Sequence, residues 1–98
     1  MKDAFQPAVY LLASKINGTL YVGVTSNLVQ RIYQHREGLI EGFTKRYDIK
    51  TLVWYELHST MESVIAKEKA MKEWRREWKI ERIRDMNPSW DDLYASIL

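Results

Sequence analysis

Two tyrosines and two basic side chains lie close together near the start of the chain, in an arrangement suited to chemistry on a phosphate. Tyr10 ends the triplet AVY and Tyr21 begins the triplet YVG, while Arg31 and His35 follow four residues apart. Arginine keeps its proton, and its planar fork of donors suits phosphate, so Arg31 is a candidate phosphate clamp. A tyrosine, with a pKa of about 10, can act as a base only where a nearby cation such as Arg31, or a metal-bound water, favours its phenolate. His35 could shuttle a proton or orient the phosphate.

Farther along the chain, Glu68 falls on the margin of the apolar stripe of a predicted helix, where an acid faces a cleft or a partner. A single carboxylate is chemically sufficient to hold Mg²⁺, which keeps most of its waters and is often bound by only one or two protein carboxylates. Each of these residues also has an ordinary interpretation. Glu68 can simply pair with Lys72, four residues later on a helix, and two strand tyrosines can belong to a core or a sheet surface.

Local patterns predict a hairpin that carries both tyrosines. Residues 8–13 form an apolar run, Asn17 and Gly18 give a strong two-residue turn signal, and residues 19–23 follow as the returning strand. Such a turn would place Ser14 opposite Tyr21. Strand alternation would then put Tyr10 and Tyr21 on one face, but several residue pairs apart.

A first helix is expected to begin at a cap within 25–27 and to continue until Gly38 and Gly42 interrupt the pattern. Leu28 and Ile32 would be buried, with Arg31 and His35 at the edge of the buried face. A polar stretch, 41–50, separates this helix from a third strand at 51–58.

In that third strand Leu52 and Trp54 should point one way and Val53 the other, so both faces are expected to be covered and the strand to be central or sandwiched. A capping box of Ser59 and Glu62 predicts a long second helix through Trp78. Its buried stripe would consist of four residues: Val64, Met71, Trp74 and Trp78. Residues 79–86 either continue it or form another helix, which ends before Asn87-Pro88.

Length and composition favour one small domain over residues 1–98, with the element order β-β-α-β-α-α. The chain has no cysteine, which excludes disulfides, thiolate metal sites and cysteine catalysis. No apolar run approaches the roughly 20 residues needed to cross a bilayer, so cytoplasmic residence is the expectation. The net charge of +2 is weak, so any contact with nucleic acid must be a local patch.

Other candidate contact residues are less distinctive. Lys45 and Arg46 are adjacent in the polar stretch, but the basic residues of 67–84 are interleaved with acidic ones, which favours a solvated helix. The four tryptophans, at 54, 74, 78 and 90, are better explained as core residues than as stacking platforms.

The two triplets, the helix residues and Glu68 together resemble the GIY-YIG nuclease superfamily, most closely its small stand-alone bacterial proteins. The resemblance implies an α+β fold with a small three-stranded antiparallel sheet flanked by helices. It implies a metal-dependent endonuclease acting on DNA, with DNA favoured over RNA, as a monomer or weak dimer. Ala8 replaces the first motif glycine, and Val24 stands where many active members have lysine.

Carried over by position, the resemblance assigns catalytic roles to Tyr10, Tyr21, Arg31, His35 and Glu68, with Glu68 binding one Mg²⁺ or Mn²⁺. It implies nucleic-acid contacts for Arg31 and Asn87, and Lys45, Arg46 and Lys72 are further candidates for such contacts. Two further hypotheses stay open. One is a non-catalytic nucleic-acid-binding module of the same fold, and the other is a protein-interaction domain that uses exposed aromatics near Trp90.

Overall fold

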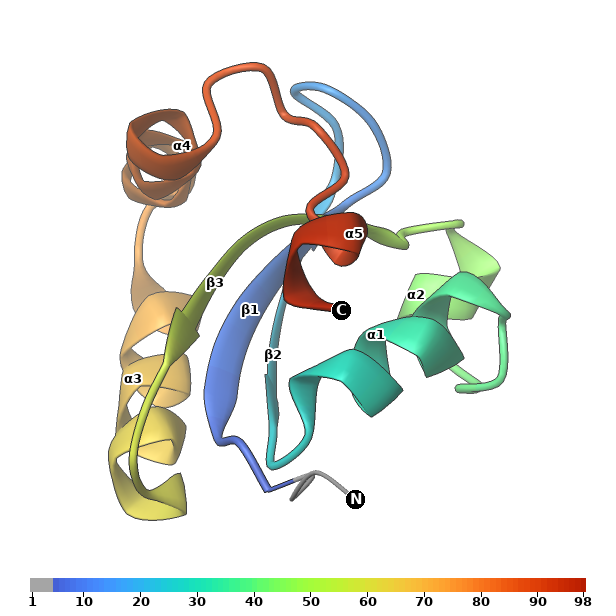
Figure 1. Ribbon diagram of the computed structural model, residues 1–98. Helices are drawn as coiled ribbons and strands as arrows, with labels where there is room; N and C mark the ends of the chain where they lie inside the picture. The colour runs from blue at the N-terminus through green and yellow to red at the C-terminus, as the bar shows by residue number, and fades with distance from the viewer. Residues whose placement is uncertain (1–4) are drawn as a thin grey trace.

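The computed structural model of the protein describes residues 5–98 and confirms the α+β class (Figure 1). Along the chain the elements are β1 (Ala8–Ala13), β2 (Leu20–Thr25), α1 (Leu28–Arg36), α2 (Phe43–Arg46), β3 (Thr51–Leu57), α3 (Met61–Glu73), α4 (Arg76–Met86) and α5 (Tyr94–Ile97). The expected order is present, with two short helices, α2 and α5, in addition. None of the helices in the described part is long and apolar enough to cross a membrane.

The sheet is antiparallel with the strand order β2-β1-β3, so β1 and not β3 is the central strand. All six residues of β1 are buried, as expected of a strand covered on both faces. The expectation of a central β3 is therefore wrong in position, although helices do cover both of its faces. The apolar run of β1 is as continuous as that of β3, so sequence alone did not separate them.

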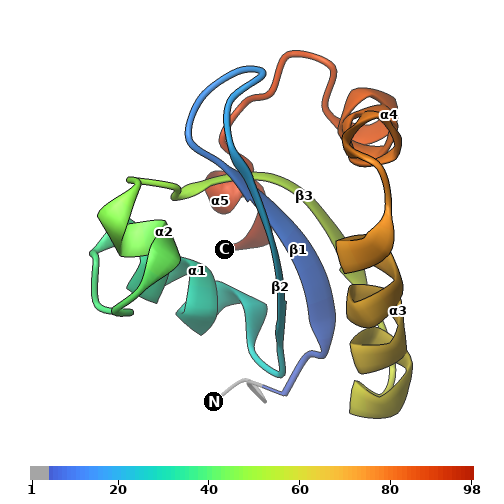
Figure 2. The same ribbon diagram turned by 180° about the vertical axis from the view of Figure 1, so that it is seen from behind.

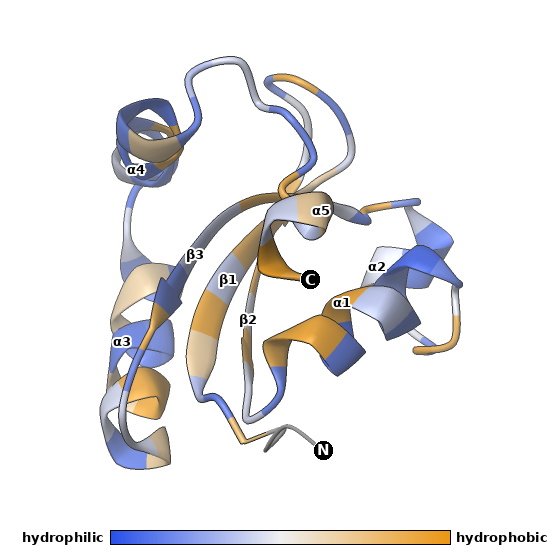
Figure 3. Ribbon diagram, viewed as in Figure 1, coloured by the Kyte–Doolittle hydropathy of each residue, from blue (hydrophilic) through white to orange (hydrophobic). Residues whose placement is uncertain are grey.

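Two layers of helices enclose the sheet, with α3 and α4 on one face and α1, α2 and α5 on the other (Figures 1 and 2). Alternate residues of β1 pack toward the two helix layers. Val9 and Leu11 belong to the first core cluster, beneath α3 and α4, whereas Tyr10 and Leu12 belong to the second, beneath α1. Figure 3 shows apolar residues along β1 and in α1.

The hairpin turn differs from the predicted two-residue turn. Ser14 pairs with Thr19, and the four residues between them form the loop, with Asn17 in a left-handed conformation (φ 58°). Tyr21 therefore lies opposite Leu12, and Tyr10 opposite Gly23. This shift by two residues keeps both tyrosines on one face and brings them closer together than predicted.

The third strand also departs from simple alternation. The register with β1 shifts between Leu11 and Leu12, which pair with Trp54 and Leu52, so Val53 is an extra residue in β3. Val53 and Trp54 consequently both pack in the first core cluster, while Leu52 packs in the second. The predicted shared face of Leu52 and Trp54 is wrong because of this bulge.

The long second helix is in fact two helices. Trp74 and Arg75 are extended (ψ 148° and 152°) and separate α3 from α4, although neither glycine nor proline marks the break. Trp74 packs against the first core cluster, whereas Trp78 is 45% exposed and leaves the predicted buried stripe. The N-cap is Thr60 rather than Ser59, and its side chain accepts a hydrogen bond from the Ser63 amide.

Candidate active site

Tyr10 lies on the central strand with its ring across the neighbouring strand at Gly23. A Cβ atom at Gly23 would lie only 2.3 Å from Cζ of the Tyr10 ring. Glycine is therefore the residue that this packing requires, and it explains the glycine of the YVG triplet. The ring is almost fully buried, with 1% exposure.

Tyr10, Tyr21 and His35 form one aromatic cluster between the sheet and α1. The ring centroids of the two tyrosines are 6.5 Å apart, and His35 lies 5.8 Å from Tyr10 and 5.9 Å from Tyr21. Tyr10 and His35 are buried, whereas Tyr21 is half-buried. The structure thus brings together three of the predicted site residues from β1, β2 and α1.

A hydrogen-bonded chain runs from Tyr10 through His35 to Thr44 in α2. Nε2 of His35 lies 3.1 Å from the Tyr10 hydroxyl, and Nδ1 lies 3.1 Å from Oγ1 of Thr44. Burial and the nearby charge of Arg31 lower the pKa of His35 to about 4. The imidazole is therefore neutral at neutral pH, with one nitrogen donating and the other accepting.

Arg31 and Glu68 act on Tyr10 with opposite signs. Burial is the main cause of a strongly raised pKa at Tyr10, and the charges of Tyr21 and Glu68 add to the rise. The positive charge of Arg31 and its hydrogen bond lower that pKa, but burial outweighs them. In the absence of a metal ion Tyr10 consequently keeps its proton at neutral pH, so the charge of Arg31 alone does not make it a base.

Glu68 comes from α3, in the helix layer opposite α1. Its side chain is 12% exposed, and one carboxylate oxygen lies 2.6 Å from Nζ of Lys72. The pKa of Lys72 is raised mainly by its hydrogen bond to Glu68, and the charge of Tyr21 contributes. Glu68 and Lys72 therefore share the electrostatic environment of the tyrosines, so the site draws on both helix layers.

The donor set fits a weakly held divalent ion better than a dedicated metal cage. Within residues 5–98 no group of three or more His, Asp and Glu side chains could hold a metal. Glu68 supplies one carboxylate, which suits Mg²⁺ or Mn²⁺ completed by water and substrate phosphate. Its present partner, Lys72, has a 55% exposed side chain and can move aside.

The other predicted contact residues lie in two different places. Lys45 and Arg46 are exposed on α2, where Lys45 forms an ion pair with Glu41 (2.9 Å). Asn87 is buried against β3, the edge strand opposite β2. Its amide nitrogen donates to the carbonyls of Val53 (3.2 Å) and Asp91 (2.8 Å), and its oxygen accepts from the Asp91 amide (3.0 Å). The structure therefore does not bring Asn87 to the tyrosines.

Sequence reasoning missed Thr44 and Phe43. Thr44 is buried and hydrogen-bonds His35, and Phe43 stacks on Tyr21 with ring centroids 6.5 Å apart and planes 27° apart. Both lie in the stretch interpreted as a polar connection. The only local signal is Gly42, whose φ of 121° lets the chain turn sharply into α2.

The fold and the site define a small α+β domain that combines a tyrosine hairpin, a following basic helix and a helix that carries Glu68. The chain belongs to the GIY-YIG nuclease family, since residues 6–81 match its GIY-YIG catalytic domain. This confirms the resemblance inferred from the two triplets.

The fold is also that of a solved structure, a UPF0213 protein from Bacillus halodurans determined by solution NMR. The two chains are 23% identical and superpose with a TM-score of 0.57, over 89% of this chain and 92% of the other. No curated protein matches the sequence significantly.

Proposed function

We propose that this protein is a metal-dependent endonuclease that hydrolyses phosphodiester bonds in DNA. The observation that carries the proposal is the meeting of Tyr10, Tyr21 and His35 in one cluster whose electrostatics include Arg31 and Glu68. Membership of the nuclease family supports it. The absence of cysteine is compatible with a cytoplasmic protein, and we propose action there as a monomer or weak dimer.

Each side chain has a role that follows from its position. Arg31 clamps the scissile phosphate and offsets the charge that develops on it. Tyr21 is the more exposed tyrosine, so it is better placed than Tyr10 to contact the attacking water. Tyr10 keeps its proton and, with His35 and Thr44, forms a chain that can relay a proton.

Glu68 is the residue that would hold Mg²⁺ or Mn²⁺. When bound, such an ion polarises the phosphate and lowers the pKa of its own water. Lys72 engages Oε2 of Glu68, and a metal ion that displaced it from this oxygen would leave Lys72 free to contact nucleic acid. The ion pair thus links metal binding to the release of a basic side chain.

The test is nicking of plasmid and oligonucleotide DNA with and without Mg²⁺ or Mn²⁺. We expect cleavage that needs the metal and falls at least about a hundredfold in Glu68→Gln and Arg31→Ala. Arg84→Ala, an exposed arginine on α4, is the matched control and should cleave normally. Cleavage that survives in both site variants, while circular dichroism shows that they are folded, would remove the site assignment.

A second candidate function is binding of nucleic acid without cleavage. One observation favours it: Lys72 already neutralises the single candidate metal carboxylate. Val24, in place of a lysine, leaves the site with one basic group fewer. Salt-dependent binding, without cleavage of duplex, single-stranded, branched or RNA substrates in Mn²⁺, would select this function.

The protein-interaction hypothesis names exposed aromatics near Trp90 as the contact surface, and the position of Trp90 does not favour it. Trp90 is half-buried and packs against the first core cluster. It adopts a left-handed conformation (φ 57°) just after the turn at Asn87-Pro88. Trp90 therefore serves the packing of the C-terminal segment and not an exposed aromatic patch.

A further inference from the structure

An exposed aromatic pair lies beside the site and has no evident role in the core. Phe43 is 50% exposed and Tyr47 is 53% exposed, although their ring centroids are only 4.9 Å apart. The buried residue of α2 is Thr44, whose side chain is engaged with His35. The two rings are therefore presented to solvent by a helix that is anchored through a different side chain.

The aromatic pair is continuous with the candidate active site. Phe43 stacks on Tyr21 with ring planes 27° apart, and Tyr21 in turn contacts Tyr10 and His35. A group lying on Phe43 and Tyr47 would consequently be a near neighbour of a phosphate held at Tyr21 and Arg31. This continuity separates the pair from the exposed Trp78 on α4, whose ring contacts Trp74 and Arg75 and not the tyrosines.

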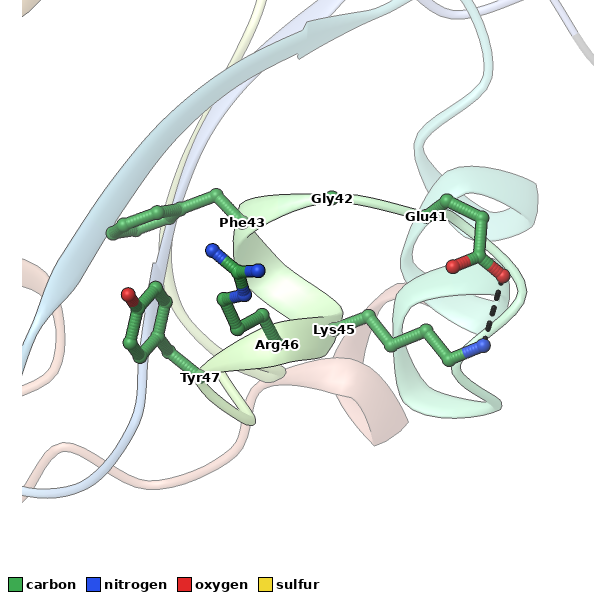
Figure 4. Close-up of a pocket in the computed structure, with 6 residues that line it drawn as sticks. All are labelled: Glu41, Gly42, Phe43, Lys45, Arg46 and Tyr47. Carbon is green, nitrogen blue, oxygen red and sulfur yellow. Dashed lines mark hydrogen bonds and ion pairs between the residues drawn. The ribbon is translucent and has the colours of Figure 1, made fainter.

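The charge around the pair suits a polyanion. Arg46 extends from α2 on the same side as Phe43 and Tyr47, whereas Lys45 points away toward Glu41 (Figure 4). Within the described residues no carboxylate forms an ion pair with Arg46. These residues line an open pocket of about 790 Å³, within the roughly 300–1,000 Å³ that small-ligand sites occupy.

We propose that Phe43, Tyr47 and Arg46, here called the α2 platform, stack an unpaired nucleobase next to the phosphate bound at the site. Every base offers a π-face, so stacking on an aromatic side chain is open to any unpaired base whatever the sequence. A paired base hides its faces within the duplex, so only unpaired nucleotides can use the platform. The substrate class is therefore nucleic acid with single-stranded nucleotides beside the scissile bond, and this inference rests on the proposed function.

Binding without divalent ions tests the platform separately from catalysis. Four fluorescein-labelled probes are compared by anisotropy: a blunt duplex, the duplex with a single-stranded DNA tail, the same tail as RNA, and the same tail built of abasic nucleotides. We expect the DNA tail to raise affinity about tenfold over the blunt duplex and the abasic tail to raise it far less. An RNA tail that binds like DNA supports recognition of the base alone, and weaker RNA binding supports additional contact with the sugar.

Substitutions in the α2 platform test whether it causes the preference for the single-stranded tail. Tyr47→Leu and Phe43→Leu keep apolar bulk but lose the π-face, and each should remove most of the tail preference. Tyr47→Phe keeps the ring and should retain it, and Trp78→Leu should behave as wild type. Because Phe43 also packs on Tyr21, Tyr47→Leu is the decisive variant.

An abasic tail that binds as tightly as the intact tail, or an unchanged preference in Tyr47→Leu, would overturn the proposal. Failure of the proposed function is distinguishable from this. If no probe is cut in Mn²⁺ while the base-dependent preference persists, catalysis fails and the platform stands. If tailed, abasic and blunt probes are cut and bound equally, the platform fails and the nuclease stands.

Discussion

The hydroxyl of Tyr10 lies 3.1 Å from Nε2 of His35, and this contact joins the central strand to the helix that follows the hairpin. The two residues are 25 positions apart in the chain. Their approach depends on Gly23, because the Tyr10 ring crosses β2 at the one residue without a Cβ atom. Strand register, a glycine and a helix face together determine the arrangement of the site.

Thr44 should be a positioning residue for His35. Thr44→Val keeps the shape but leaves Nδ1 of His35 unpaired in a buried position, so the free energy of unfolding should fall by about 1–3 kcal/mol. Cleavage should fall as well, and Thr44→Ser should restore both. Urea denaturation measures the change in the free energy of unfolding, and the nicking assay measures cleavage. Nitrogen NMR shifts of the His35 ring report whether Nδ1 has lost its partner. Thr19→Val, at an exposed position directly after the hairpin loop, is the control, and equal behaviour of the two valine variants would contradict the role.

Gly23→Ala should be destabilising by about 1–3 kcal/mol, because the new methyl group overlaps the Tyr10 ring. The reason is testable with a double-mutant cycle. In a Tyr10→Leu background the ring is absent, so the added cost of Gly23→Ala should largely disappear. Additive effects in the cycle would show that a cause other than the ring contact is responsible.

Stability should decrease as the pH falls from about 6.5 to about 4. The unfolded chain protonates His35 near its ordinary pKa of 6.5, whereas the folded state resists protonation until about pH 4. Protonation in this window therefore favours unfolding, by up to ~3 kcal/mol. Urea melts at pH 7 and pH 4.5 measure it, and His35→Gln should flatten the dependence. Although burial acts to raise the pKa of Glu56, hydrogen bonds from His58 and Lys67 hold it below its usual value. The stability that ionised Glu56 contributes is therefore lost only at still lower pH.

The general plan of the fold could be predicted from residue patterns, because each element has a local signal. The β1 run, the capping residues before α1 and α3, and the proline after α4 are all short-range features. The register of the hairpin was not predictable, because Asn17-Gly18 suits both a two-residue turn and the observed four-residue loop. Only packing of the Tyr10 ring over Gly23 distinguishes these registers.

The site was also predicted only in part, because local sequence patterns do not determine tertiary contacts. Tyr10 and Tyr21 share a face as expected, but they lie closer together than predicted, and His35, expected at the edge of the buried face, is buried against them. The break at Trp74-Arg75 and the burial of Thr44 arise from tertiary contacts of Trp74 and His35, which leave no mark in local sequence. Asn87 is a case in which the sequence suggested too much. Its position in the chain predicted a contact with nucleic acid, but the residue is buried.

Asn87→Ala should consequently affect stability and not function. It removes three hydrogen bonds, one from the buried amide nitrogen to β3 and two that join Asn87 to Asp91 in the segment after α4, so a loss of about 2–4 kcal/mol is expected. Cleavage and DNA affinity per folded molecule should be unchanged at a temperature where the variant remains folded. Asn27→Ala, which removes the α1 N-cap, should cost only about 1 kcal/mol. A selective loss of DNA affinity would instead restore the predicted contact.

Lys72→Met should make the carboxylate of Glu68 more available to a metal ion, because the 2.6 Å ion pair is removed. We expect half-maximal cleavage at a several-fold lower Mn²⁺ concentration. The affinity for DNA should fall at the same time, with the slope of log affinity against log salt shallower by about one unit. The neighbouring exposed Lys69→Met serves as the control. An unchanged Mn²⁺ requirement would argue that the ion pair does not compete with the metal.

The central place of β1 has a consequence for the order of folding. The hairpin of β1 and β2 needs only local contacts, but Leu12 finds its other partner, Leu52, forty residues later (52 − 12 = 40). Long-range pairing of this kind is slow compared with hairpin formation. The tyrosine hairpin can therefore form first, with one edge of β1 exposed, and the site becomes rigid only when β3 covers that edge.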